Sequence, residues 1–161
     1  MSPNSHPFAS RISVLLLKAI ILASLLCSAA CEIDTSISIN ENVPPTFSFS
    51  GSGYMTFFIV KEIAPENQNV SDVEQNSDRN NVIWWIWPNQ EVDKPMSKLL
   101  PITYGEIPEG WNQREPKNGN PPNLIEGKVY EAGCVAASAN GDYIRFIVRN
   151  GKAVDVPIPQ R

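Results

Sequence analysis

The clearest architectural information in this chain lies in Asp142–Val156, which reads DYIRFIVRNGKAVDV. The first half alternates with a period of two, as a half-buried strand does, and its inward face would hold Ile144, Phe146 and Val148. On the opposite face, we expect Arg145 and Arg149 to point outward. Asn150-Gly151 favours the positive φ angles of a type I′ turn, after which Lys152–Val156 returns. The segment therefore predicts a tight antiparallel hairpin.

A second hairpin is predicted directly before the first. One face of its leading strand would carry Tyr130, Ala132, Cys134 and Ala136. The small and polar residues of Ser138–Asp142 would then turn the chain. Pro157 and Pro159 have no backbone N–H to donate, so we expect them to end the last strand at a sheet edge. Two consecutive hairpins indicate an antiparallel sheet.

A short motif precedes these hairpins and connects them to a known architecture. Leu124, Gly127 and Tyr130 have L-x-x-G-x-x-Y spacing. This spacing resembles the tyrosine corner of fibronectin type III and related immunoglobulin-like domains, in which the tyrosine hydrogen-bonds back to the preceding loop. The resemblance implies an all-β fold, an antiparallel immunoglobulin/fibronectin-like β-sandwich. The chain departs from that family in a polar stretch at 64–80 and in the proline-rich run Pro108–Pro122.

Three more strands are predicted nearer the N-terminus. Residues 35–40 and 46–50 alternate polar and apolar side chains on either side of Val43-Pro44-Pro45. Tyr54–Ile63 is β-branched and aromatic, so we expect a central strand that is apolar on both faces. One of its faces would hold Met55, Phe57 and Ile59, and the other Phe58 and Val60. No helix longer than a turn or two is expected after residue 31.

An export signal precedes the predicted strands. Arg11 and Lys18 lead into the apolar run Ala19–Leu26, and small residues then occupy positions 28–30 before Cys31. The cysteine after small residues resembles the lipobox of bacterial lipoproteins. The resemblance implies a diacylglyceryl group on the Cys31 sulfur, cleavage after Ala30, and a protein anchored in the cell envelope. Glu32 is not the aspartate associated with inner-membrane retention, so the resemblance favours the outer membrane.

Two alternatives to lipidation remain open. Ordinary cleavage after Ala30 would leave a secreted domain in which a Cys31–Cys134 disulfide becomes possible. An uncleaved anchor is the other alternative, although the apolar run after Lys18 is short for a ~30 Å hydrocarbon core. The lipoprotein interpretation divides the chain into a signal peptide at 1–30, a lipidated N-terminus and tether at 31–34, and one β-sandwich domain at 35–161 with a polar loop at 64–80. Cys134 would then be a small buried core residue.

Charge and composition exclude several function classes. Two of the 13 basic residues precede Cys31, which leaves 11 basic and 17 acidic residues, a formal charge of −6. Nucleic acid is therefore not an expected partner. The only histidine is His6, inside the signal, so histidine-based catalysis and most zinc sites are not expected. No nucleophile-elbow, P-loop or CxxC pattern occurs, and we expect no cofactor, no metal site and no catalytic residues.

The stretch Val82–Pro88, VIWWIWP, is the most conspicuous candidate binding surface. In a strand, Trp85 and Trp87 would share one face with Ile83, while Trp84 would lie on the other. Trp111 could join the exposed indoles from a loop. Indoles beside Asn89, Gln90, Asn112 and Gln113 would suit stacking on sugar rings, but core packing is the simpler expectation for most of them.

Three function classes follow from these observations. The first is a lipid-anchored, non-catalytic envelope domain with a structural or protein-binding role. The second is a carbohydrate-binding module that uses Trp84, Trp85, Trp87 or Trp111. The third is a carboxylate-dependent hydrolase, which would need two acidic groups about 5–10 Å apart in a cleft. Its candidate carboxylates are Glu106, Glu109, Glu115, Glu126 and Glu131. Expected partners are thus the membrane through the lipid, and an envelope protein or a glycan.

Overall fold

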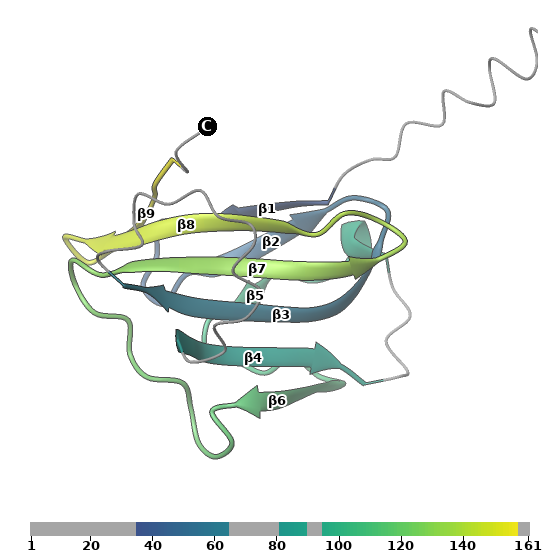
Figure 1. Ribbon diagram of the computed structural model, residues 1–161, viewed down its shortest axis with the longest axis horizontal. Helices are drawn as coiled ribbons and strands as arrows, with labels where there is room; N and C mark the ends of the chain where they lie inside the picture. The colour runs from purple at the N-terminus through teal and green to yellow at the C-terminus, as the bar shows by residue number, and fades with distance from the viewer. Residues whose placement is uncertain (1–34, 65–80, 90–94, 158–161) are drawn as a thin grey trace, which may run out of the picture. The chain divides into compact units, whose positions relative to one another are not determined.

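The computed structural model describes residues 35–64, 81–89 and 95–157, which belong to one compact unit, Ile33–Arg161. The predicted signal peptide, Cys31, the tether at 31–34, Pro159 and all of the polar loop except Ala64 lie outside these residues. The rest forms two antiparallel sheets packed face to face (Figure 1). The predicted all-β sandwich is therefore confirmed.

The smaller sheet has three strands in the order β1-β2-β5. They are β1 (Ser36–Ile39), β2 (Thr46–Ser50) and β5 (Ile102–Thr103). The larger sheet has six strands in the order β6-β4-β3-β7-β8-β9. They are β3 (Tyr54–Ile63), β4 (Val82–Pro88), β6 (Trp111–Glu115), β7 (Val129–Ala137), β8 (Asp142–Arg149) and β9 (Lys152–Asp155). A short 3-10 turn, η3 (Met96–Lys98), lies between β4 and β5.

Seven of the nine strands follow an order that resembles an immunoglobulin-like sandwich without strand D. In that notation β1, β2 and β5 take the places of strands A, B and E, and β4, β3, β7 and β8 take those of C′, C, F and G. β6 and β9 are added at the two edges of the larger sheet (Figure 1). The tyrosine corner accordingly lies at the start of the F-like strand, β7.

Aromatic side chains fill the space between the sheets. The ring of Phe47 on β2 lies 5.0 Å from that of Phe58 on β3 and 5.9 Å from that of Phe146 on β8, measured between centroids. Phe49 meets Phe58 at 5.4 Å. The sheets are also joined by a hydrogen bond of 2.8 Å from Ile37 N to Asp142 Oδ2. These contacts confirm that Phe146 points inward, as the hairpin pattern predicts.

The predicted hairpins are present. β7 and β8 pair from Val129–Ile147 to Cys134–Asp142, and β8 and β9 pair around the Asn150-Gly151 turn. Asn150 and Gly151 have φ angles of 55° and 70°, as a type I′ turn requires. Tyr130, Ala132 and Cys134 are buried together on the inner face of β7.

Arg145 points outward, as predicted, but its side chain is covered rather than exposed. Its residue exposure is only 6%, and its Nε lies 3.1 Å from Glu131 Oε2 on the neighbouring strand. Lys61 Nζ approaches the other oxygen of the same carboxylate at 3.4 Å. Arg145 does lie on the face opposite Phe146, as the alternation requires. The alternation of a strand determines only which face Arg145 lies on. Its ion pair with the Glu131 carboxylate on the neighbouring strand explains why the side chain is covered there.

The expected face of Met55 was wrong. Met55 pairs with Ala136 and Phe57 pairs with Val135, so Thr56 is an extra residue in β3 and forms a bulge. The bulge returns Met55 to the inner face, where it is buried with Phe58. β3 is nevertheless interior to the larger sheet, between β4 and β7, as its two apolar faces predict.

Candidate functional site

β4 divides its three tryptophans between the two faces of the larger sheet. Trp84 is fully buried in the core, where its ring lies 5.9 Å from Phe58 and 5.3 Å from Tyr104. Its Nε1 donates a hydrogen bond of 3.1 Å to Gln113 Oε1. Trp84 is thus a core residue with a satisfied polar atom.

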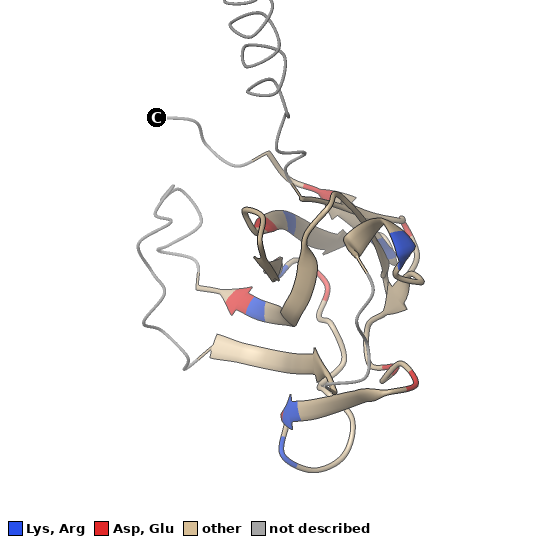
Figure 2. Ribbon diagram, turned by 90° about the vertical axis from the view of Figure 1, so that its right-hand side faces the viewer, with Lys and Arg blue, Asp and Glu red and all other residues tan. Residues whose placement is uncertain are grey.

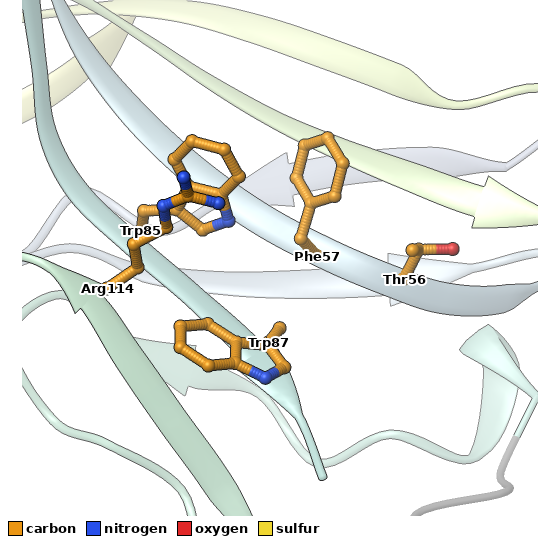
Figure 3. A pocket seen from close by; sticks show the side chains of 5 residues that line it. All are labelled: Thr56, Phe57, Trp85, Trp87 and Arg114. Atoms are coloured by element: carbon orange, nitrogen blue, oxygen red, sulfur yellow. The ribbon is translucent and has the colours of Figure 1, made fainter. Parts of the chain in front are cut away.

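Trp85 and Trp87 lie on the other face of the sheet, which we call the outer face because it points away from the smaller sheet. With three residues of the neighbouring strands they line a hollow of about 240 Å³ (Figure 3). The other lining residues are Thr56 and Phe57 from β3 and Arg114 from β6. The Phe57 and Trp85 rings lie 5.4 Å apart with planes inclined at 45°. These five residues are called the aromatic hollow below.

Two bulges place the polar groups of the aromatic hollow. Thr56 is the extra residue of β3, so its side chain and that of the next residue, Phe57, both lie on the outer face. On β6, Glu115 pairs with Trp85 and Gln113 pairs with Ile86, which makes Arg114 an extra residue opposite β4. Bulges are common where a strand has to redirect a side chain, and here each of the two supplies a polar side chain to the hollow.

Arg114 lies over the face of Trp85, with its Cζ 4.5 Å from the ring centroid (Figure 3). The contact is a cation–π interaction. In the part of the chain that the structure describes, no carboxylate lies within ion-pair distance of Arg114. β4 itself bears no charged residue (Figure 2). Arg114 therefore supplies the only formal charge among the five lining residues.

Trp111 is not part of the aromatic hollow. It begins β6 opposite Pro88 and packs, half-buried, against the core. Of the amides near the tryptophans, Gln113 also donates to the carbonyls of Pro116 and Gly119, at 2.8 and 2.9 Å, so its hydrogen-bonding groups serve the fold. Asn112 is exposed and pairs with Trp87 in the ladder. Gln90 lies outside the described residues.

The tyrosine-corner residues come together as the motif predicts. The Tyr130 hydroxyl accepts a hydrogen bond of 2.8 Å from Ile125 N. Gly127 has a φ of 80° and donates its N–H to Val148 O at 2.8 Å, and Leu124 packs against the core. Burial is the main cause that raises the pKa of Tyr130. These residues hold the loop before β7 in place and lie apart from the residues that line the hollow.

Cys134 is a buried residue with a free thiol. Burial raises its pKa to about 11, so the reactive thiolate is suppressed at neutral pH. Cys31, the predicted lipidation site, lies outside the described residues.

Two of the candidate carboxylates have structural roles. Glu126 accepts hydrogen bonds from the backbone N–H groups of Asn150 and Gly151 in the β8–β9 turn. Glu131 binds Lys61 and Arg145. Neither lines the aromatic hollow, and none of the five lining residues is acidic. Within the described ranges, no three histidine, cysteine, aspartate or glutamate residues are grouped closely enough to hold a metal ion.

Comparisons with protein-family models, with curated proteins and with solved structures found no match to this chain. Among residues 35–64, 81–89 and 95–157, no helix has the length and apolar character needed to cross a membrane.

Proposed function

We propose that this protein is a lipid-anchored, non-catalytic binding module of the bacterial cell envelope, and that its aromatic hollow binds a carbohydrate. The observation that carries the proposal is the pair of half-buried indoles, Trp85 and Trp87, beside Phe57 on the outer face of the sheet. Aromatic faces attract the C–H groups of a sugar ring, and polar groups at the rim can bind its hydroxyls.

The position of the hollow favours a sugar over an extended peptide. Peptides commonly bind by adding a strand to a free sheet edge. β3 and β4, which supply four of the five lining residues, are both interior strands whose backbone groups are used by neighbours on either side. The hollow therefore offers side chains rather than a row of main-chain partners.

The lining also favours binding over hydrolysis at this position. Glycoside hydrolysis by the usual route needs two carboxyl groups flanking the scissile bond. The five residues of the aromatic hollow supply none. A sugar held there would be recognised without an acid or a base from the lining to act on it.

Attachment to the envelope rests on the sequence of residues 1–31. Mass spectrometry of the intact protein, combined with detergent partitioning, tests it directly. A diacylated N-terminal Cys31 is the expected result. A retained Met1 or an unmodified Cys31 would contradict the anchoring part of the proposal.

Carbohydrate binding is tested by tryptophan fluorescence titration of the full-length protein with a broad panel of oligosaccharides. We expect saturable quenching that Trp87→Ala abolishes. Tyr54→Ala is the matched control, because Tyr54 is an exposed aromatic residue of β3 outside the hollow. Absence of a response across the whole panel, or equal loss in both variants, would contradict carbohydrate binding in the hollow.

A further inference from the structure

The polar groups that line the aromatic hollow are mainly hydrogen-bond donors. Its four polar side-chain groups are the Arg114 guanidinium, the indole N–H groups of Trp85 and Trp87, and the Thr56 hydroxyl. The guanidinium and the two indoles can only donate hydrogen bonds, and the hydroxyl can donate as well as accept. No lining residue is a carboxylate or an amide. The hollow is therefore complementary to a ligand that is rich in acceptors.

Three of these groups, on Thr56, Trp87 and Arg114, have no hydrogen-bond partner among the described residues. Arg114 contacts Trp85 through a cation–π interaction, with its Cζ 4.5 Å from the ring centroid, and makes no hydrogen bond or ion pair to a described residue. The guanidinium is therefore held beside Trp85 while its N–H groups remain available to a ligand. A planar fork of this kind matches a carboxylate, which it can bind through two parallel hydrogen bonds.

The size and shape of the hollow suit a single ring. At about 240 Å³ it is smaller than the cavities of ~300–1,000 Å³ that enclose drug-sized ligands. Its floor consists of aromatic side chains from adjacent strands, and Arg114 from β6 lies over the Trp85 ring and brings the charge to that side (Figure 3). A pyranose ring stacked on the floor would bring a carboxylate substituent toward Arg114.

From this complementarity we infer that the carbohydrate bound by the hollow is acidic, and that a uronic acid residue of a polysaccharide occupies it with its carboxylate on Arg114. This inference rests on the proposed carbohydrate-binding function and adds the class of sugar. Binding is non-covalent and no bond in the ligand is broken.

The experiment compares acidic oligosaccharides with neutral ones that differ in one group. Oligomers of glucuronic, galacturonic and mannuronic acid are titrated into the full-length protein, together with the same oligomers after reduction of their carboxyl groups to primary alcohols. We expect the acidic form of at least one pair to bind about tenfold more tightly than its reduced form, as for a charge-assisted hydrogen bond. The preference should weaken as salt is added.

Two variants locate the effect. Arg114→Gln removes the charge and should reduce affinity for the acidic oligomer about tenfold while changing affinity for the reduced oligomer less than about twofold. Lys117→Gln changes the net charge by the same amount but lies outside the lining, and it should bind like the wild type. Circular dichroism and the thermal midpoint show that both variants are folded.

The outcomes separate this inference from the proposal on which it depends. Equal binding of acidic and reduced oligomers, with loss in Trp87→Ala, would overturn the acidic ligand and leave carbohydrate binding intact. Equal effects of Arg114→Gln and Lys117→Gln would also overturn it, because long-range charge would then explain the preference. Failure of every oligomer, acidic or reduced, to bind would overturn both.

Discussion

Trp84 Nε1 and Gln113 Oε1 form a hydrogen bond of 3.1 Å that joins the core indole to β6, an edge strand. The Gln113 amide nitrogen continues the connection to the carbonyls of Pro116 and Gly119. One amide thus satisfies a buried donor and fixes the loop after β6, the strand that supplies Arg114.

Gln113→Leu should lower the free energy of unfolding by about 1–3 kcal/mol, because the indole N–H of Trp84 would be left without an acceptor in the core. Urea denaturation measures the effect. Asn112→Ala is the control, since this exposed neighbour should change stability by less than about 0.5 kcal/mol. Equal midpoints for the two variants would show that the hydrogen bond does not stabilise the fold.

Tyr130→Phe should destabilise the protein by about 1 kcal/mol through loss of the acceptor for Ile125 N. Tyr143→Phe provides the comparison, because Tyr143 is a partly exposed tyrosine on the adjacent strand β8. Amide hydrogen exchange at Ile125 should also become faster in the Tyr130 variant alone. Unchanged exchange would contradict the role assigned to the corner.

The Cys134 thiol should react with thiol reagents only as fast as the protein unfolds at neutral pH. In the folded state its pKa is raised to about 11 by burial, whereas an unfolded thiol titrates near ~8.5. The protonated thiol is therefore favoured by folding. Its contribution to stability is fully present below about pH 8.5 and is lost as pH rises through about 11.

A chain with serine at positions 27 and 31 isolates Cys134 for this measurement. Thiolate absorbance followed against pH in folded and denaturant-unfolded protein should give two separated titrations. Rapid modification at neutral pH without loss of the native circular dichroism would contradict the buried assignment.

Gly141→Ala and Gly133→Ala should differ in their effect on stability. A Cβ at Gly141 would overlap the carbonyl oxygen of Cys134, which is backbone and cannot move aside cheaply, so we expect a loss of about 1–3 kcal/mol. A Cβ at Gly133 would meet nothing closer than the Cβ of Tyr143 at 3.5 Å, so that variant should be nearly neutral. Thermal unfolding of the two variants checks this. A larger loss of stability for Gly133→Ala than for Gly141→Ala would show that the β7–β8 turn can move away from Cys134 to make room for the added Cβ.

Local sequence patterns predicted much of the larger sheet. The Asn150-Gly151 turn and the alternation of β8 depend on near neighbours, and the Tyr130 corner is a compact motif, so each could be recognised without knowledge of the rest. β5 and β6 were not expected as strands. β5 has two residues, and β6 lies in a polar, proline-rich run with Trp111 as its one large apolar residue. Both depend on pairing with distant strands.

The composition of the aromatic hollow could be predicted only in part. Alternation correctly separates Trp84 from Trp85 and Trp87, but it does not say which face meets the other sheet. Trp111 was grouped with them because its strand was not foreseen. Arg114 was missed altogether, since its place over Trp85 depends on a bulge between two strands far apart in the sequence.

As the extra residues of their bulges, Thr56 and Arg114 stand outside the regular alternation that builds the buried core. Deleting either codon would restore regular alternation to its strand without turning the remaining side chains over. A single-residue insertion or deletion in β3 or β6 would therefore add or remove one of these two polar groups without changing the packing of the buried core.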